Sequence, residues 1–409
     1  MIIERKAAPK LKALKAWTLV FGRRKTGKTF MVRNSVLWDR YFFVRRDRTI
    51  SDDQGTLNYE TFIEALRNGL IENKRTIVID EFHRLPESFF DYLHQISPDR
   101  KGRLILISST LSLAKKFFSS KSPLLGLFAE MLIPIFSLNE TLAALPKNFP
   151  LKDKLELAVL MREPLTIQLL ENNLSKESLS ELVQFSRKAI PSLIGETFSE
   201  EERTLSAIYE GILRAVATGK VISGEISSYL FSRKLLEKDN PSLIQQHLLT
   251  LIELGILRRI IVFDQRKFIY KHTSPLVKMF YLADEKYTIG ERELNPNELQ
   301  EIISMNLPII IEDNVREFLS QKLGLTESVA EGSDYEVDGL LLKFKKPEVA
   351  LEVKWKKSLK REDIEKAIKN LGKFNVKRKI LFVPDKNSSL SFKEELKSIE
   401  VMDVNDLEK

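Results

Sequence analysis

Residues 21–30, "FGRRKTGKTF", decide the fold of the first part of this chain. From Gly22 to Thr29 the stretch has the spacing G-x-x-x-x-G-K-[ST]. It follows a short apolar run, residues 16–22, and leads into a stretch with helical periodicity. Two glycines at this spacing let a loop curl so that successive backbone N–H groups converge on phosphate oxygens. The stretch therefore predicts a phosphate-binding loop between a strand and a helix.

The residue types in this loop predict ATP and Mg²⁺ as cofactors. Lys28 can reach the β- and γ-phosphates as a point charge, and the Thr29 hydroxyl can ligate the Mg²⁺. The helix that begins near Lys28 adds its positive N-terminal end. The residues expected to contact the nucleotide are Gly22, Arg23, Arg24, Lys25, Thr26, Gly27, Lys28, Thr29 and Phe30.

A second chemical group ends the apolar stretch "TIVIDEFHRLP", residues 76–86. Asp80 is placed to hold the Mg²⁺, and Glu81 to orient and deprotonate the attacking water. One strand later, Ser108 and Ser109 either touch the γ-phosphate or cap the following helix. The pattern predicts ATP hydrolysis, with Lys28 and Glu81 as catalytic residues and Ser109 as a further nucleotide contact.

Apolar strands alternate with helices from residue 16 to residue 110, with later strands expected at 41–47, 75–82 and 103–110. Such alternation is typical of a parallel sheet that is covered on both faces. Residues 139–197 read as helices throughout, and strands return in the last hundred residues. We therefore expect a multidomain α/β protein.

The composition bounds the class of protein. A chain of 409 residues is expected to form two to four domains. Cys is absent from the sequence, which excludes disulfides and thiolate metal sites and suits a reducing interior. The charged start "MIIERKAAPKLKALK" does not resemble a secretion signal, and the apolar residues 124–138 are too few to span a membrane and include Glu130. We expect a cytoplasmic location and no membrane partner.

Four segments, "VFGRRKTGKT", "YFFVRRD", "IDEFHRLP" and "LILISST…SPLLG", resemble in this order and spacing the archaeal-type ATPases of the AAA-related P-loop superfamily. The resemblance covers roughly residues 10–285 and implies an ATPase core, a helical lid and a winged helix, in that order. In the family, the last segment usually continues with an arginine, but here Leu127 follows Gly126. An arginine that senses the γ-phosphate is then missing, or it is supplied by another residue. The alternatives are Arg23, Arg24 and Arg162. This departure puts in doubt the rate of hydrolysis and its dependence on contacts within a homo-oligomer.

Three helices and a hairpin are expected between residues 203 and 272, which is the pattern of a winged helix–turn–helix. If this module binds DNA, Ser242, Gln245 and Gln246 would face the major groove, and Arg266 and Lys267 on the wing would lie near phosphate. The third helix is rich in leucine and poor in basic residues. A packing role between proteins or domains is therefore slightly favoured over DNA binding.

The stretch "SDYEVDGLLLKFKKPEVALEVKW", residues 333–355, holds a second set of chemical groups. Asp338 on one strand and Glu352 on the next can grip a divalent metal, and Lys354, on the same strand face as Glu352, can position or deprotonate a water. Glu312 from an upstream helix could add a third carboxylate. The pattern resembles the PD-(D/E)XK nucleases, whose fold is the restriction-endonuclease-like fold. The alternatives are an exposed hairpin with a solvated Glu352–Lys354 pair, or the same fold without activity.

Charge points to DNA as a partner. Residues 340–380 hold 14 Lys or Arg against 5 Asp or Glu, an excess of +9, comparable to the +8 of the entire chain.

The predicted domains are a P-loop ATPase core (1–138), a helical lid (139–198), a winged helix (199–290) and a nuclease-like domain (291–409). Three functions fit this order: an ATPase that drives or gates a DNA-acting domain, a nucleotide-controlled signalling switch, and a nucleotide-dependent DNA-binding regulator.

Overall fold

The computed structural model describes residues 2–111, 122, 124–170, 174, 178–201, 203–332, 335–356 and 358–408. The chain divides into two compact units. The N-terminal unit consists of Glu4–Ile135 and Ser192–Thr204, and the C-terminal unit consists of Phe136–Pro191 and Leu205–Lys409 together with Met1–Ile3. The finer division into four domains stays a prediction.

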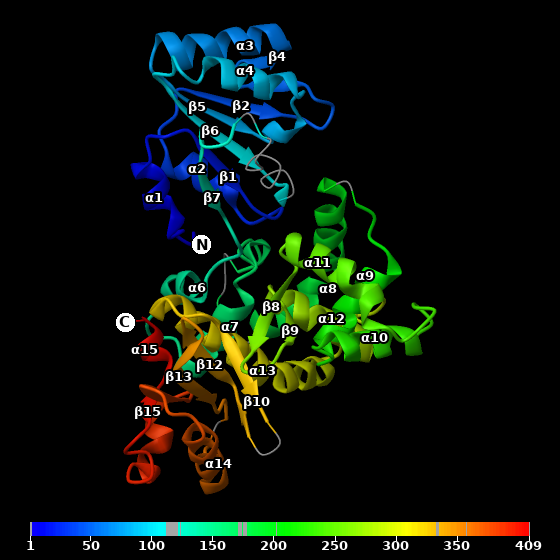
Figure 1. The fold of residues 1–409 in the computed structure, drawn as a ribbon, viewed down its shortest axis with the longest axis vertical. Coiled ribbons are helices and arrows are strands. Elements are labelled where there is room, and N and C mark those ends of the chain that lie inside the picture. Colours follow the sequence, from blue (N-terminus) through cyan, green and yellow to red (C-terminus); the bar gives the residue numbers. More distant parts are fainter. Residues whose placement is uncertain are drawn as a thin grey trace. The chain divides into compact units, whose positions relative to one another are not determined.

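A seven-stranded sheet forms the N-terminal unit, in the order β4-β3-β2-β5-β6-β1-β7 (Figure 1). The five strands from β2 to β7 in this order run parallel, as predicted, whereas β3 and β4 extend the sheet as an antiparallel hairpin. The strands are β1 (Thr18–Phe21), β2 (Arg40–Val44), β3 (Ile50–Asp52), β4 (Gly55–Leu57), β5 (Thr76–Asp80), β6 (Arg103–Ser108) and β7 (Ala129–Leu132).

Helices cover both faces of this sheet, as Figure 1 shows. The helices α1 (Ala7–Ala13) and α2 (Lys28–Ser35) pack on one face, and α3 (Tyr59–Arg67) and α4 (Ser88–Ile96) pack on the other. Because successive strand residues point to opposite faces, β1 sends Leu19 into the α3–α4 core and Val20 into the α1–α2 core. The carboxyl ends of the parallel strands are thereby left to carry the polar residues of the site.

The C-terminal unit begins with helices, as the sequence predicted. These are α6 (Leu138–Ala144), α7 (Leu151–Leu160), α8 (Ser178–Glu200), α9 (Ala207–Ala217), α10 (Ser223–Ser232), α11 (Gln245–Glu253), α12 (Pro275–Tyr287) and α13 (Pro296–Leu323). The chain passes between the units within α8: Pro191, inside this helix, is the last residue of the C-terminal unit before Ser192. The final residues of α8 therefore belong to the N-terminal unit.

The hairpin predicted after the third helix is formed by β8 (Leu257–Val262) and β9 (Phe268–His272). It does not stand alone, because β10 (Ser328–Glu331) pairs in parallel with β8, and β11 (Glu336–Val337) follows β10. The ammonium of Lys267 lies 2.5 Å from a carboxylate oxygen of Glu331. The ion pair gives Lys267 an acidic neighbour at the surface, and the expected position of Lys267 near DNA phosphate stays a prediction.

A second four-stranded sheet, in the order β12-β13-β14-β15, lies near the C-terminus (Figure 1). β12 (Gly339–Lys343) and β13 (Lys346–Val353) form the predicted hairpin, while β13, β14 (Arg378–Phe382) and β15 (Glu400–Met402) are parallel. The helix α14 (Arg361–Gly372) packs on this sheet through a common core, and α15 (Val404–Glu408) ends the described chain. The predicted order of hairpin, helix and strand is observed, whereas kinship with the nuclease fold stays a proposal.

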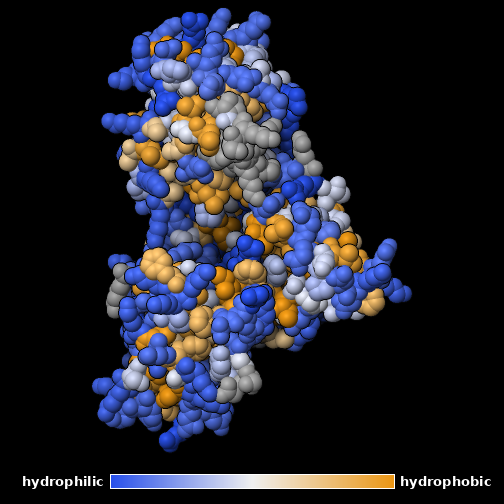
Figure 2. All heavy atoms as spheres, in the orientation of Figure 1, coloured by the Kyte–Doolittle hydropathy of each residue, from blue (hydrophilic) through white to orange (hydrophobic). Residues whose placement is uncertain are grey.

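The surface drawn in Figure 2 is mostly hydrophilic, with hydrophobic residues in separate patches. Within the described residues, every helix is too short or too polar to cross a bilayer.

Candidate nucleotide site and C-terminal carboxylate cluster

The predicted phosphate-binding loop joins β1 to α2, and its two glycines have distinct structural reasons. A Cβ at Gly22 would collide with the carbonyl oxygen of Ile133, so only glycine fits beside the end of β7. Gly27, directly before α2, has φ +83°, a left-handed conformation that glycine adopts without a steric penalty. The Thr26 hydroxyl donates to the Arg23 carbonyl at 2.9 Å, which closes the loop from within.

Lys28 begins α2 and is buried, with 6% of its surface exposed. Its ammonium donates to the Arg23 carbonyl at 2.8 Å, which holds the side chain along the loop. Burial lowers the pKa of Lys28 to about 8, although the carboxylates of Glu81 and Asp80 act in the opposite direction. The side chain is thus a buried cation at neutral pH, directed to the place where phosphates are expected.

Asp80, at the end of β5, is the predicted Mg²⁺ anchor, and two hydroxyls converge on it. Its Oδ2 accepts from the Thr29 hydroxyl at 2.8 Å and from the Tyr41 hydroxyl at 2.6 Å. Burial raises the pKa of Asp80, while these two hydrogen bonds act to lower it. Carboxylate and hydroxyl oxygens are ligands that suit Mg²⁺, so Thr29 and Asp80 fit the ion. Tyr41 was not predicted to belong to the site.

Glu81 follows Asp80 in a left-handed backbone conformation, with φ +56°, which is uncommon for a residue other than glycine. Its Oε2 accepts from the Ser109 hydroxyl at 2.9 Å and lies 3.4 Å from Nδ1 of His83. The Ser109 hydroxyl also donates to Glu200 at 3.3 Å. Ser108 instead contacts His83, at 3.2 Å. Ser109 thus contacts two acids of the candidate site. The segment that the serines would cap, residues 112–120, lies outside the described residues, so both predicted roles of Ser108 and Ser109 stay predictions.

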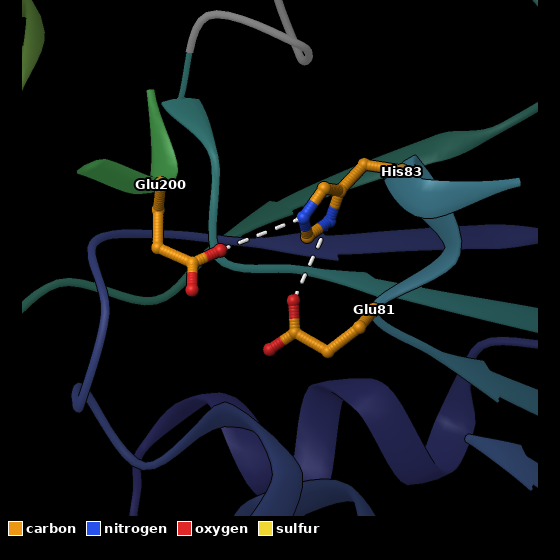
Figure 3. A group of neighbouring side chains, drawn as sticks. All are labelled: Glu81, His83 and Glu200. Atoms are coloured by element: carbon orange, nitrogen blue, oxygen red, sulfur yellow. Dashed lines mark ion pairs between the residues drawn. The ribbon is translucent and has the colours of Figure 1, made fainter. Parts of the chain in front are cut away.

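Figure 3 shows His83 between two carboxylates, those of Glu81 and Glu200. Nε2 of His83 lies 3.6 Å from Oε2 of Glu200, which is the last residue of α8. Burial lowers the pKa of His83 to about 4, and the nearby Arg84 adds to the shift. The imidazole is therefore neutral at pH 7 and acts as a polar spacer between the two acids.

Two arginines bind the carboxylates at the end of α8. Arg24, from the loop, donates to Glu196 at 2.6 Å and also to Glu200. Arg84, from the segment after β5, lies 3.4 Å from Oε2 of Glu200. Burial alone would raise the pKa of Glu200, but the charges of Arg24 and Arg84 outweigh it and hold this pKa below its ordinary value. The sequence predicted Arg24 at the site and missed Arg84, Glu196 and Glu200.

Arg162 and Arg23, the other two arginines that the sequence offered as γ-phosphate sensors, have other surroundings than Arg24. Arg162 belongs to the C-terminal unit, where its guanidinium forms two bonds to Glu317 at 2.8 and 2.9 Å. Arg23 is buried in the loop, with its carbonyl accepting from Lys28. Arg24 is thus a predicted arginine whose side chain reaches Glu196 and Glu200, near the end of α8.

A pocket of about 940 Å³ opens beside the loop. Lys28, Thr29 and Phe30 line it from the loop and α2, and Glu81 and Ser109 line it from the strand ends. Phe30 is 53% exposed, so a ligand could cover its ring. The pocket therefore brings together most of the residues that the sequence assigned to nucleotide binding and to hydrolysis, whereas Gly22, Arg23, Thr26 and Asp80 do not line it.

The predicted C-terminal residues also meet. Asp338 lies just before β12, and its Oδ2 accepts from the backbone N–H of Val353 at 2.7 Å. Glu352, at the end of β13, is 1% exposed, and its Oε2 lies 2.5 Å from the ammonium of Lys354. The amide of Asn370, from α14, donates to the other oxygen of Glu352 at 2.9 Å. Asn370 was not predicted from the sequence.

The acidic groups of this cluster repel one another. Burial raises the pKa of Asp338 to about 6, and the charge of Glu352 adds to the rise. Burial also raises the pKa of Glu312 to about 8, with Asp338 and Asp313 adding to it. Burial alone would lower the pKa of Lys354, but Glu352 and Asp338 outweigh it and raise this pKa. Such perturbed groups are typical of sites that bind a cation or carry out proton transfer.

The carboxylates of Asp338 and Glu352 are the oxygen donors that a hard divalent cation prefers. Glu312 does not complete a set of three with them: among the described residues, the group of three whose ligand atoms lie within 4.8 Å of one another is Glu81, His83 and Glu200. Glu312 lies 3.5 Å from a guanidinium nitrogen of the buried Arg316, whose charge acts to lower the pKa of Glu312 against the effect of burial. The expectation of Glu312 as a third ligand is thus not met by this arrangement.

Comparison with known proteins identifies the first part of the chain. Residues 15–142 match the family model described as an AAA domain. The matched range contains the loop, the Asp80–Glu81 strand end and Ser109. Together with the site geometry, this match shows that the N-terminal unit holds an AAA-type P-loop ATPase domain. A search of curated proteins finds no match to the chain.

Solved structures resemble this chain only distantly. The ORC2 protein of Aeropyrum pernix, in its ADPNP and ADP complexes, is 13% identical with a TM-score of 0.42, covering 75% of this chain and 95% of that one. A signal transduction ATPase with numerous domains and a tetratricopeptide repeat sensor, from Pyrococcus horikoshii, is 14% identical with a TM-score of 0.33, covering 79% of this chain and 51% of that one. The RuvB Holliday junction branch migration motor of Thermotoga maritima is 14% identical with a TM-score of 0.28, covering 71% of this chain and 91% of that one. These likenesses are too distant to support a functional argument.

Proposed function

We propose that the N-terminal unit binds and hydrolyses ATP with Mg²⁺, and that its nucleotide state controls a DNA-acting C-terminal unit. The main support for ATP binding and hydrolysis is the hydrogen bond of 2.8 Å from the Thr29 hydroxyl to the Asp80 carboxylate, together with the buried Lys28. A homo-oligomer and a cytoplasmic location belong to the same proposal.

The residues of the loop and strand ends divide the work of hydrolysis. Lys28 binds the β- and γ-phosphates, and Thr29 and Asp80 would hold the Mg²⁺, which supplies charge neutralisation on the phosphates when bound. Glu81 accepts the proton of the attacking water, and the Ser109 hydroxyl, 2.9 Å from Glu81, orients that carboxylate.

The nucleotide part is tested by an ATPase assay on the full chain and on Glu81→Gln. The amide keeps the shape of the side chain but cannot accept the proton, so ATP binding is expected to persist while turnover falls by roughly 10²–10⁴-fold. Glu60→Gln, which removes one exposed carboxylate from α3, is the matched control and should turn over like the wild type. Normal turnover by Glu81→Gln would contradict the assigned base.

For the C-terminal unit, we propose metal-dependent cleavage of a phosphodiester. Asp338 and Glu352 would hold the divalent ion, which supplies Lewis-acid chemistry when bound. Lys354 lies 2.5 Å from Glu352 and has the reach to position the attacking water or the scissile phosphate. The local excess of basic residues between 340 and 380 supports binding of a nucleic-acid backbone.

A plasmid-nicking assay with Mg²⁺ or Mn²⁺ tests this part. Asp338→Ala and Glu352→Ala are each expected to abolish cleavage and divalent-ion binding, whereas Lys354→Ala should slow cleavage but keep ion binding, since a protonated ammonium has no lone pair. ATP turnover without DNA should be unchanged in all three. Glu348→Gln, on the same strand β13, is the matched control. Cleavage by Asp338→Ala at the wild-type rate would contradict the assigned site.

A binding module without nuclease activity is the second candidate. It is favoured by the ammonium of Lys354 on Glu352, which satisfies the charge of this carboxylate without a metal, and by the position of Glu312 beside Arg316. This candidate predicts nucleotide-dependent binding of DNA or of a protein, with no nicking at any divalent-ion concentration.

A further inference from the structure

Five side chains converge on the carboxylate of Glu200, all from segments of the ATPase site, and among them Arg46, which follows β2, lies 3.6 Å away. Arg24 donates to it from the phosphate-binding loop. The Ser109 hydroxyl donates at 3.3 Å, the Arg84 guanidinium lies at 3.4 Å, and Nε2 of His83 lies at 3.6 Å. Figure 3 shows this carboxylate directed toward His83 and Glu81.

This set of donors has the composition of a phosphate site rather than of a site for a single carboxylate. Two guanidinium groups and a hydroxyl can satisfy the three oxygens of a terminal phosphoryl group, and guanidinium groups match phosphate geometry well. Two of these donors, Ser109 and Arg84, also lie 2.9 and 3.7 Å from Glu81, the proposed base, which must lie beside the γ-phosphate to activate water. Both the charge and the position of the set therefore suit the γ-phosphate of ATP.

We infer that Arg24 and Arg84 bind the γ-phosphate of ATP, and that the Glu200 carboxylate is a built-in substitute for this phosphate which ATP must displace. The inference rests on the proposed nucleotide site. Arg84 would then take the role of the arginine that the resembling family carries where this chain has Leu127. Because Arg84 lies four residues after Asp80 in the same chain, it needs no partner subunit for this role.

A metal ion held by Glu81, His83 and Glu200 is a weaker explanation of the same convergence. The ligand atoms lie close enough for an ion. However, Arg24 and Arg84 both contact Glu200, so an added cation would face two positive charges at short range. An anion in the place of the Glu200 carboxylate would instead be attracted by the positive charges of both arginines.

Displacement of Glu200 would move the end of α8. Glu200 is the last residue of this helix, and the same helix belongs to the C-terminal unit up to Pro191. A proline within a helix removes one backbone hydrogen bond and weakens the helix at that point. ATP, but not ADP, would therefore release residues 192–200 from the donors around Glu81, which gives the C-terminal unit a signal that depends on the γ-phosphate.

Equilibrium binding of a non-hydrolysable ATP analogue and of ADP, both with Mg²⁺, tests this on the full chain. Because a competing internal group reduces the apparent affinity, Glu200→Gln is expected to lower the Kd for the analogue by about tenfold and to leave the Kd for ADP unchanged. Arg84→Ala should raise the Kd for the analogue by about tenfold and also spare ADP. Glu181→Gln, an exposed residue of the same helix, is the matched control and should change neither value.

The outcomes separate this inference from the function on which it rests. Equal changes for the analogue and ADP, or no change with Glu200→Gln, would overturn the inference while leaving ATP binding in place. A wild-type chain that binds neither nucleotide would overturn the proposed function itself.

A distance measurement tests the movement in a background with intact Glu200. The chain has no cysteine, so Leu37→Cys and Ser199→Cys, both at exposed positions of the N-terminal unit, can carry two spin labels without other changes. The label-to-label distance distribution is expected to shift with the ATP analogue and to stay unchanged with ADP. An unshifted distribution at a saturating concentration of the analogue would overturn the displacement of Glu200.

Discussion

The Tyr41 hydroxyl donates to Oδ2 of Asp80 at 2.6 Å, the same oxygen that accepts from Thr29. Tyr41 lies on β2, the strand that pairs in parallel with β5, so the sheet itself aims the hydroxyl at the proposed Mg²⁺ anchor. The carboxylate is therefore oriented by the protein before any ion binds.

Tyr41→Phe is expected to lower the ATP turnover number by about tenfold, since a hydrogen bond to a charged group contributes roughly 1.5–3 kcal/mol. The apparent affinity for Mg²⁺ should weaken with it, because Asp80 loses one of the two hydroxyl groups that orient its Oδ2. A titration of steady-state turnover against Mg²⁺ measures both effects. Tyr92→Phe, on α4 with its hydroxyl at 3.4 Å from a backbone carbonyl, is the control. An unchanged Mg²⁺ dependence in Tyr41→Phe would show that Tyr41 has no role in orienting the anchor.

Lys28→Ala is expected to weaken ATP binding by roughly a hundredfold, about 3 kcal/mol, because it removes a buried charge that faces the phosphates. Calorimetric titration of ATP into the full chain measures this change. Lys101→Ala, which removes an exposed lysine of the same unit, should bind ATP as the wild type does. ATP binding of wild-type strength in Lys28→Ala would contradict the assignment of the loop.

Asn370→Ala is expected to weaken divalent-ion binding to the C-terminal cluster by about tenfold without removing a ligand. The Asn370 amide donates to Glu352 at 2.9 Å and to the Glu336 carbonyl at 2.7 Å, so its loss frees the Glu352 carboxylate to turn. Titration with Mn²⁺ followed by electron paramagnetic resonance reports the affinity. Asn387→Ala, on the 3₁₀ helix Lys386–Phe392 of the same unit, is the control. Equal affinities of Asn370→Ala and the wild type would mean that Asn370 is a packing residue alone.

Because of His272, we expect the free energy of unfolding to decrease in acid. It is buried at the end of β9, its Nε2 lies 3.0 Å from the Leu213 carbonyl, and burial lowers its pKa to about 3. Its ordinary pKa is near 6.5, so between pH 6.5 and 3 the unfolded chain binds the proton and the folded chain does not. Stability from this residue is therefore present above pH 6.5 and falls by about 1.4 kcal/mol for each pH unit below it.

His272→Phe should flatten this acid limb, although the variant starts from a lower stability because the hydrogen bond to Leu213 is lost. Urea unfolding at a series of pH values between 4 and 7.5 gives the two slopes. His94→Phe, an exposed histidine on α4, should keep the slope of the wild type. Parallel slopes for His272→Phe and the wild type would contradict a neutral buried His272.

The phosphate-binding loop could be predicted because its chemistry is local. Gly22, Gly27 and Lys28 act within eight residues, and the flanking strand and helix each show their own periodicity. The strand hairpin β3–β4 was missed because each strand has three residues, too few for a period of two to be recognised. Tyr41 was missed because strand order decides which residues face Asp80, and the sequence does not state strand order.

The place of Glu200 in the site could not be predicted from the sequence, for a related reason. It lies 119 positions after Glu81, in a helix that is ordinary by its own pattern, and only the tertiary fold returns it to the loop. The motif after β5 did hold a signal for Arg84 and His83, since both follow the Asp80–Glu81 pair within four residues. In the C-terminal cluster, strand alternation placed Glu352 and Lys354 together, whereas the contact between Glu312 and Arg316 depends on helix spacing, four residues apart.

The parallel pairing of β8 with β10 has a consequence for biosynthesis. β8 ends at Val262 and β10 begins at Ser328, so the ribosome releases the first strand well before its neighbour. At about 5–20 residues per second, the edge of β8 waits several seconds with its backbone groups unpaired, in a form that other nascent chains can bind. Pairing of β10 with Ile261 and Val262 is therefore expected to protect this end of the hairpin from aggregation. Truncation of the chain after α12 is expected to yield inclusion bodies, whatever chemistry the carboxylates perform.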